Sequence, residues 1–509
     1  MADQFLTILK RLLRNPLVFA ESASGLKLRR YQEQVATAVV NSIMDHQGLT
    51  FVVMFPRQSG KNELQAQIEA FILLLLSESN PSAEIVKVSP TWKPQSLNAM
   101  RRLERVLTRN LITRSMWTKE SCYIYRVGSA RIYFFSGSPE ASIVGATAST
   151  LLEVDEAQDV EISKFDKDIA PMAASTNATR VFWGTAWSSR TLLARELAAS
   201  HEAEQRDGIR RTFVINADQV SLEVPAYGLF VSEQVARLGR NHPMVKTQFY
   251  SETIDSEAGM FPPARIALIR GDHSAISDPQ SAINNQKSKI FAFLVDVAGQ
   301  DENFQDPSQS LANPKRDSTV LTVVEIDLAT VADPLIKRPT YNVVYRRSWT
   351  GVSHTDQYAS IKALADLWRP RHVVVDATGI GASLASFLDR ALPGKVIPFT
   401  FTSSSKSKLG WDFLACIETG RFKDYNPADP AFLQQLAFCS LAVQPGPGHL
   451  IKWSVPDNTR DPATGDLVHD DLVLSAALVA VLDEQPWTPP GQTLVIPAAD
   501  PILSMDIGF

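Results

Sequence analysis

Residues 51–62 constrain the fold more than any other part of the chain, because they read FVVMFPRQSGKN. A short apolar run changes here into a polar turn that ends in Gly60-Lys61, and helix-forming residues follow from 63 to 76. A buried strand, a turn and a helix in this order build a phosphate-binding loop, whose backbone N–H groups and lysine surround phosphate oxygens. Such a strand belongs in a parallel sheet that helices cover on both faces.

Two letters of this loop depart from the usual motif. Pro56 stands at the position of the first glycine, and Asn62 at the position of the Ser or Thr whose hydroxyl contacts Mg²⁺. A Gly-Lys pair alone is a weak signal, so its interpretation depends on the motifs that accompany it.

Strand-like and helix-like runs alternate from about residue 28 to residue 215. The strand candidates are 49–55, 84–89, 130–135, 151–154 and 180–184, and helical runs at 65–76 and 95–107 lie between them. This alternation predicts an α/β domain with a parallel sheet flanked by helices.

An acidic pair follows one of these strands. The apolar run 151–154 ends in Asp155-Glu156, where one carboxylate can hold Mg²⁺ and the other can orient the water that attacks ATP. We therefore assign Asp155 to the metal and Glu156 to water activation. The alternative is an acidic helix start that favours the helix dipole, and the upstream Gly60-Lys61 makes it the weaker interpretation.

Two single residues support a nucleotide site. Gln32 precedes the loop by about 25 residues and can offer both a donor and an acceptor to an adenine edge, although a glutamine at a helix start is commonplace. Thr185 ends the strand candidate 180–184, where its hydroxyl could report hydrolysis from beside the γ-phosphate. Its alternative role is a strand cap.

Three separated carboxylates mark a second site. Asp296 interrupts an apolar strand, which is costly to bury without a partner or a metal. Asp376 ends the strand candidate 371–376, and Asp470-Asp471 open the apolar stretch 472–482. Asp376 could alone be a turn residue, and Asp470 or Asp471 an N-cap. Together they follow the layout of ribonuclease H-like nucleases, which bind two divalent ions, Mg²⁺ or Mn²⁺.

Length and composition set the domain organisation. The 509 residues are too many for one ordinary core, and the net charge of −5 confines any nucleic-acid surface to local patches. No apolar stretch reaches the roughly 20 residues that span a bilayer, so we expect no membrane partner. The expected parts are a P-loop NTPase domain with an N-terminal helical arm, a helical lid or linker, a ribonuclease H-like domain with a mixed sheet, and a Pro-rich tail, at 1–225, 226–287, 288–485 and 486–509.

The motifs Arg-Gln-Ser-Gly-Lys and Val-Asp-Glu-Ala-Gln, followed by the three acids, resemble the large terminase subunit of tailed double-stranded DNA bacteriophages. The resemblance covers about residues 28–482. It implies an ATPase that drives double-stranded DNA into a procapsid and a nuclease that cuts concatemeric DNA. It implies catalytic roles for Lys61, Arg57 and Thr185, and a nucleotide loop formed by Arg57, Gln58, Ser59, Gly60, Lys61 and Asn62.

The resemblance also implies partners and a place of action. The expected partners are DNA, the portal protein, the small terminase subunit and further copies of the chain in a ring, which we expect to be a pentamer. The expected location is the host cytoplasm, transiently at the portal vertex, and not the mature virion. Arg126 or Arg131 could supply a finger in trans. Lys406 and Lys408 are expected in a flexible basic loop beside the nuclease acids.

Two other functions stay open. A helicase–nuclease of DNA repair would need a second motor domain, and residues 215–290 show no helicase motifs. A non-catalytic DNA or portal adaptor would explain Asn62, whereas Lys61, Glu156 and the nuclease acids favour an enzyme.

Overall fold

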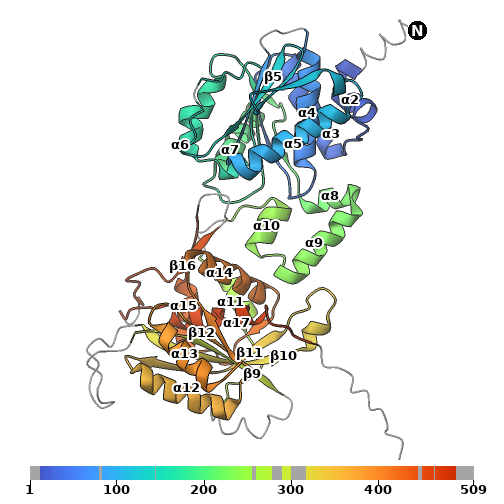
Figure 1. Ribbon diagram of the computed structural model, residues 1–509. Helices are drawn as coiled ribbons and strands as arrows, with labels where there is room; N and C mark the ends of the chain where they lie inside the picture. The colour runs from blue at the N-terminus through green and yellow to red at the C-terminus, as the bar shows by residue number, and fades with distance from the viewer. Residues whose placement is uncertain are drawn as a thin grey trace, which may run out of the picture. The chain divides into compact units, whose positions relative to one another are not determined.

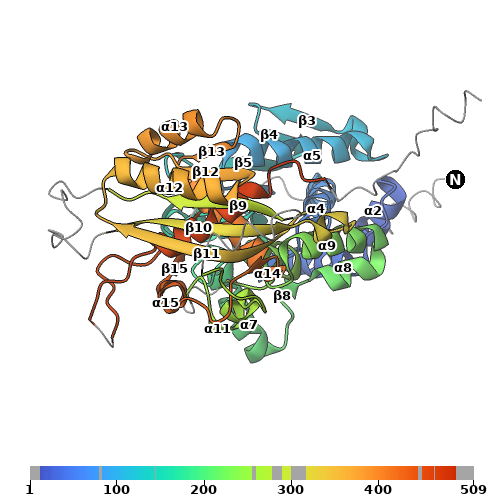
Figure 2. The ribbon, with the colours of Figure 1, turned by 90° about the horizontal axis from the view of Figure 1, so that it is seen from below.

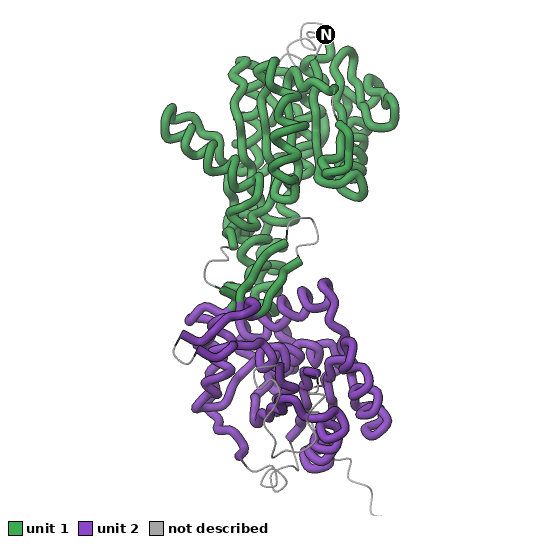
Figure 3. Tube along the Cα trace, turned by 90° about the vertical axis from the view of Figure 1, so that its left-hand side faces the viewer, with its two compact units in different colours: residues 1–260, 440–454 green, residues 261–439, 455–509 purple. Residues whose placement is uncertain are grey.

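The computed structural model describes most of the chain, in the ranges 12–78, 83–143, 145–254, 259–277, 289–299, 317–444, 450–462 and 465–488. The start of the expected N-terminal arm, the polar segment 300–316 and the tail beyond 488 lie outside the described residues. The chain divides into two compact units (Figure 3), unit 1 with 1–260 and 440–454, and unit 2 with 261–439 and 455–509. The domain boundaries expected from the sequence stay predictions.

Unit 1 combines a sheet with helices packed against it (Figure 1). Its eight-stranded sheet has the order β3-β4-β5-β2-β6-β7-β1-β8. The six strands from β5 to β8 run parallel, which confirms the predicted fold class. β3 and β4 add an antiparallel edge that the sequence analysis missed. The strands are β1 (Thr50–Met54), β2 (Glu84–Ser89), β3 (Trp117–Glu120), β4 (Ile124–Val127), β5 (Ala130–Ser136), β6 (Leu151–Val154), β7 (Thr179–Gly184) and β8 (Thr212–Val214).

Helices bury both faces of this sheet, because successive side chains of a strand point to opposite sides. Phe51, Val53 and Phe55 join the core under α2, α3, α4 and α5, whereas Val52 and Met54 join the core on the side of α7. The helices of unit 1 include α2 (Pro16–Ala23), α3 (Arg30–Met44), α4 (Lys61–Leu76), α5 (Leu97–Arg109), α7 (Leu192–Asp207), α8 (Ala217–Glu223), α9 (Pro225–Leu238) and α10 (Pro243–Tyr250).

Unit 2 is built on a mixed six-stranded sheet in the order β13-β12-β9-β10-β11-β14, as predicted. β9 pairs antiparallel with β10 and parallel with β12, so the carboxyl ends of β9 and β12 share one edge. The strands are β9 (Ile290–Asp296), β10 (Ser318–Asp327), β11 (Thr340–Thr350), β12 (His372–Asp376), β13 (Val396–Phe399) and β14 (Phe422–Lys423). The hairpin of β15 (Ser440–Val443) and β16 (Ile451–Ser454) groups with unit 1.

Helices also flank the sheet of unit 2 (Figure 2), with α12 (His354–Trp368) and α13 (Gly381–Ala391) on one side. The other side carries α14 (Ser403–Glu418), α16 (Asp471–Ala477) and α17 (Val479–Leu482); α11 (Pro263–Ile269) and α15 (Pro430–Phe438) pack beside them. Among the described helices, none combines the length and apolarity that a membrane crossing needs.

The prediction of a flexible basic loop at Lys406 and Lys408 is wrong, because both lysines lie inside α14. Thr402 caps this helix by accepting a hydrogen bond from the Ser405 N–H, and the Ser405 hydroxyl bonds back to the Thr402 backbone. These two reciprocal hydrogen bonds form a capping box, which stabilises the start of the helix. The serine-rich sequence of this stretch is otherwise typical of a loop.

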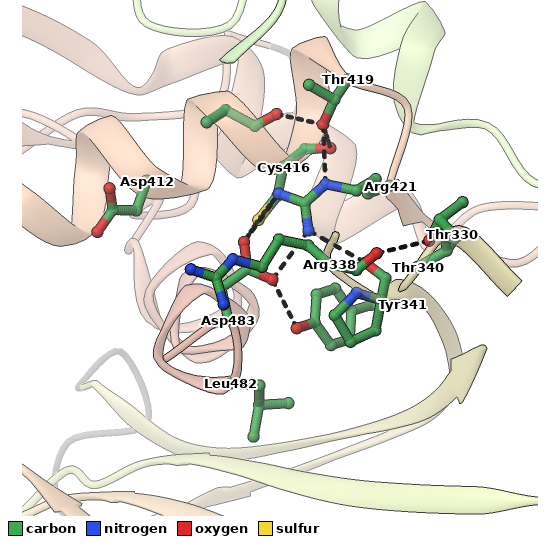
Figure 4. Close-up of polar contacts among 12 residues, drawn as sticks. Thr330, Arg338, Thr340, Tyr341, Asp412, Cys416, Thr419, Arg421, Leu482 and Asp483 are labelled. Atoms are coloured by element: carbon green, nitrogen blue, oxygen red, sulfur yellow. Dashed lines mark hydrogen bonds and ion pairs between the residues drawn. The ribbon is translucent and has the colours of Figure 1, made fainter. Parts of the chain in front are cut away.

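A buried ionic clamp holds the end of α17 in place (Figure 4). Arg421 donates to both carboxylate oxygens of Asp483 at 2.8 Å, and the Tyr341 hydroxyl donates to the same carboxylate at 2.7 Å. Arg421 is 3% exposed and also reaches the Cys416 sulfur on α14. The clamp therefore joins β11, α14 and α17.

Candidate functional site

The predicted phosphate loop connects β1 to α4 in a conformation that requires a glycine. Gly60 has φ +94°, in the left-handed region that L-residues avoid, and a Cβ there would lie 2.6 Å from the Gln32 amide nitrogen. The Ser59 hydroxyl donates to the Pro56 carbonyl at 2.7 Å and closes the turn. α4 then begins at Lys61, with its N-terminus directed at the loop.

Glu156 is held by the loop lysine. Lys61 Nζ lies 2.8 Å from Glu156 Oε1, and the Gln158 amide donates to Glu156 Oε2 at 2.8 Å. Burial opposes ionisation of this carboxyl, but the charge and hydrogen bond of Lys61, with Gln158 and Arg57, outweigh it and lower its pKa. Glu156 also has φ +46°, a strained backbone of the kind that concentrates at functional sites.

Most of the predicted nucleotide residues surround one cavity of about 830 Å³. Cations of the loop and carboxylates that follow β6 line it together, which is the donor set that a phosphate chain and its divalent ion require. Its lining includes Arg57, Gln58, Gly60, Lys61, Asn62, Asp155, Glu156 and Thr185, and also Lys93, Arg102, Gln158 and Asp159, which the sequence analysis did not assign to the site.

Gln32 and Ser59 do not line this cavity. Ser59 lies within the loop, and Gln32 supports the loop through a hydrogen bond to its backbone. The Gln32 amide donates to the Gly60 carbonyl at 3.1 Å and accepts from the Arg29 N–H at 3.0 Å. Arg29 and the Tyr31 hydroxyl both donate to the Ser59 carbonyl at 2.7 Å. Both amide atoms of Gln32 are therefore engaged, and its role in reading adenine stays a prediction.

Gln158 connects Glu156 to the predicted coupling segment at Thr185. Its amide nitrogen donates to Glu156, and its Oε1 accepts from the Thr185 N–H at 3.1 Å. A Cβ at Gly184 would lie 2.3 Å from Gln158 Oε1, so only a glycine leaves room for this link. Gln158 lies in the Val-Asp-Glu-Ala-Gln motif. A side-chain amide can donate and accept hydrogen bonds at the same time, and this property was the sequence feature that could have identified Gln158 as a link.

The predicted nuclease acids meet at one edge of the sheet in unit 2. Asp296 ends β9 and Asp376 ends the neighbouring parallel strand β12, next to the register pair Val295–Val375. Burial raises the pKa of Asp296 well above its usual range, and the negative charges of Asp471, Asp376 and Asp470 raise it further. The structure thus brings all four predicted acids together.

Asp471 takes part in a smaller cluster with two residues that were not predicted as site residues. The Ser318 N–H donates to Asp471 Oδ2 at 2.7 Å, and burial raises the pKa of this carboxyl to about 7. His469 Nδ1 lies 2.6 Å from Asp317 Oδ1, and donor atoms of Asp317, His469 and Asp471 all lie within 4.8 Å of one another. Asp317 directly precedes β10, which pairs antiparallel with β9, and this pairing of distant strands was the information that the sequence analysis lacked.

This donor set fits hard divalent cations. Buried carboxylates that repel one another are relieved by a cation among them, and oxygen donors are the ligands of Mg²⁺ and Mn²⁺. Lys406 Nζ lies 3.8 Å from Asp470 Oδ2 and supplies a nearby positive charge from α14.

Arg126 and Arg131, the finger candidates, lie on β4 and β5 and both pair with Glu120, at 3.2 Å and 3.3 Å. Their role in trans stays a prediction. Arg102 instead pairs with Glu63 at 3.0 Å on the wall of the nucleotide cavity.

Residues 304–436 match the family model of the terminase RNaseH-like domain. This segment contains Asp376, and the match supports the resemblance to large terminase subunits. None of the curated proteins matches the chain.

Solved structures similar to this chain include three from bacteriophages. The HK97 large terminase is 12% identical over 92% of this chain and 99% of its own, with a TM-score of 0.39. The large terminase of a thermophilic bacteriophage, in complex with ADP, is 10% identical over 90% and 99%, with a TM-score of 0.45. The large terminase nuclease of the thermophilic phage G20c with bound magnesium is 19% identical over 45% and 98%, with a TM-score of 0.30.

Proposed function

Because residues 304–436 match a terminase RNase H-like domain, we propose that the chain is a DNA-packaging motor with a nuclease. Unit 1 hydrolyses ATP to translocate double-stranded DNA into a procapsid, and unit 2 cuts the concatemeric DNA. The family match carries the proposal. The cavity around Lys61, Asp155 and Glu156 supports its ATPase part, and the cluster around Asp296 supports its nuclease part.

In unit 1 the chain's own residues divide the work of hydrolysis. Lys61 and Arg57 bind the phosphate oxygens, and Glu156 accepts the proton of the attacking water. Phosphate at Lys61 would compete with Glu156 for the ammonium, so substrate binding itself would release the base. Asp155, with the Asn62 amide, would hold Mg²⁺, which neutralises the charge of the phosphates.

In unit 2 the acids at the ends of β9 and β12 and the start of α16 would hold two divalent ions, Mg²⁺ or Mn²⁺. Such ions activate water and stabilise the leaving oxygen of a phosphodiester. Lys406, on α14 beside Asp470, would contact the DNA backbone and hold the scissile phosphate near the acids.

The proposal extends to partners and location. The motor would act as a homo-oligomeric ring, a pentamer, with the portal protein and the small terminase subunit. It would work in the host cytoplasm at the portal vertex of the procapsid and be absent from the mature virion.

Two variants of the full chain test the proposal. Glu156→Gln should lower the rate of ATP hydrolysis by about 100-fold or more, because it removes the base, and should leave Mn²⁺-dependent nicking of plasmid DNA intact. Asp296→Ala should abolish nicking and leave ATP hydrolysis intact, so each variant controls for the folding of the other. Wild-type protein without either activity would indicate an adaptor, and ATP-driven unwinding of a forked duplex would indicate a helicase–nuclease.

A further inference from the structure

A buried group of charged side chains lies beneath the nucleotide cavity of unit 1. Lys87, on β2, is 2% exposed, and its Nζ donates to Glu69 Oε1 at 2.6 Å and to Gln65 Oε1 at 2.7 Å. Glu69 and Gln65 are one turn apart on α4, and Glu153 lies opposite Lys87 on β6. Apolar residues would join α4 to the sheet at a lower desolvation cost, so packing alone does not account for these charges.

Lys87 determines which way the Gln65 amide points. A lysine ammonium has three donors and no acceptor, so it binds the amide oxygen and not the amide nitrogen. The Gln65 nitrogen then faces the other way, where it donates to Asp155 Oδ1 at 2.9 Å. A flipped amide would set its nitrogen against the ammonium and its oxygen against the carboxylate.

Asp155 is oriented as a result. Its Oδ1 also accepts from the Glu156 N–H at 3.1 Å, so two donors fix this oxygen on the protein side. Oδ2 is then the oxygen left for the cavity that Asp155 lines. We propose that Lys87 and Gln65 are positioning residues that turn Asp155 toward the divalent ion of the nucleotide. This inference rests on the ATPase function proposed above.

Lys87 stays protonated in this buried environment. Burial opposes it, but the carboxylates of Glu69, Glu153 and Asp155 outweigh burial and raise the pKa of Lys87 above its usual value. The ammonium therefore persists as a donor across the physiological range, and the amide of Gln65 keeps one orientation.

The test compares two Gln→Leu variants of the same helix in the full chain. Gln65→Leu removes the donor to Asp155, whereas Gln67→Leu changes a buried glutamine that contacts only Glu63 among the described partners. Partners that orient metal ligands typically contribute about 10–100-fold in metal affinity. Gln65→Leu should therefore raise the Mg²⁺ concentration for half-maximal ATP hydrolysis about 10-fold, with kcat recovering at saturating Mg²⁺. Gln67→Leu should leave this concentration unchanged.

A second variant removes Lys87, which fixes the orientation of the Gln65 amide. Lys87→Met combined with Glu69→Gln deletes both members of the ion pair and should shift the Mg²⁺ dependence in the same direction. A purely structural role would lower the melting temperature or the active fraction without moving the Mg²⁺ midpoint. A wild-type midpoint in Gln65→Leu overturns the proposal, and this variant decides alone if the double variant does not fold.

Direct metal binding separates this inference from the ATPase proposal. The ADP-dependent part of Mn²⁺ binding, followed by electron paramagnetic resonance, excludes ions held by the acids of unit 2, needs no turnover and should show the same 10-fold weakening in Gln65→Leu. Wild-type protein that binds Mn²⁺ and ADP but hydrolyses no ATP would contradict the proposed function alone. Equal Mn²⁺ affinities in the wild type and Gln65→Leu, or a wild type that binds no Mn²⁺ with ADP, would contradict the positioning role.

Discussion

At the scale of single residues, the two candidate sites differ in how they treat their carboxylates. The pKa of Glu156 is lowered because the charge and hydrogen bond of Lys61 outweigh its burial, so this carboxyl is ionised at neutral pH. Burial raises the pKa of Asp296, and the negative charges of Asp471, Asp376 and Asp470 raise it further; burial also raises the pKa of Asp471 to about 7. Glu156 thus has a lysine in direct contact, whereas Asp296 lies mainly among other carboxylates.

The raised pKa values predict how Mn²⁺ stabilises the protein as pH changes. An acid whose folded pKa lies above its unfolded value stabilises the fold at low pH, and this stability is lost as pH rises through the folded value. The metal-free protein should therefore lose stability between about pH 4 and 8, and Mn²⁺ should restore it, since it binds the deprotonated acids. Melting curves should show a larger Mn²⁺-induced rise in melting temperature at pH 8 than at pH 6.

Asp471→Asn provides the control for this effect. The variant should be more stable than wild type at pH 8 without metal, because one buried charge is gone, and should gain less from Mn²⁺. A metal-induced rise that is the same at both pH values in the wild type would contradict the expected role of the raised pKa values.

At the scale of elements, the clamp of Arg421, Asp483 and Tyr341 ties the end of α17 to its neighbours. Asp483→Ala would leave a buried guanidinium without its partner, and breaking a buried pair in this way costs about 3–5 kcal/mol. We therefore expect a loss of that size in the free energy of unfolding, measured by urea denaturation.

The next residue along the chain provides the matched control. Glu484 pairs with Lys408 at 2.6 Å, but both side chains are about 60% exposed. Exposed pairs contribute about 0–1 kcal/mol, so Glu484→Ala should be nearly neutral. Equal effects of the two substitutions would show that the clamp does not hold α17.

Individual elements also show which parts of the fold could be predicted from the sequence. The parallel strands β1, β2, β5, β6 and β7 were found because strands buried in a covered sheet are mainly apolar, even where Lys87 and Glu153 interrupt β2 and β6. The edge strand β3 is only partly buried and carries polar residues, so it gave no such signal. α14 was mistaken for a loop because its capping residues are serines and threonines, although Leu409, Phe413 and Ile417 follow at helical spacing.

At the scale of the whole molecule, the chain has two units, each with its own sheet and core. The acids of both candidate sites could be predicted, since each ends a strand or begins a helix. The residues that orient them could not, because Lys87, Gln65 and Asp317 gain their roles only through pairing between distant segments. Sequence spacing alone does not reveal such contacts.

Separate cores predict that the two kinds of ligand stabilise separate parts of the protein. A ligand that binds only the folded state raises the melting temperature of the unit that it binds. Scanning calorimetry should therefore resolve two transitions, one raised by a non-hydrolysable ATP analogue and the other by Mn²⁺. Asp296→Ala should abolish the response of the second transition only. A single transition that both ligands raise equally would contradict this expectation.

The short distance between Gly184 and the Gln158 side chain restricts which substitutions the two positions can accept. Because a methyl group there would collide with Gln158, the two positions are not free to mutate independently. In a library of random variants selected for activity, Gly184→Ala should survive only alongside a shorter residue at 158, and that residue would in turn release both Glu156 and Thr185. We therefore expect almost no accepted substitutions at either position, in contrast to exposed neighbours such as Arg190.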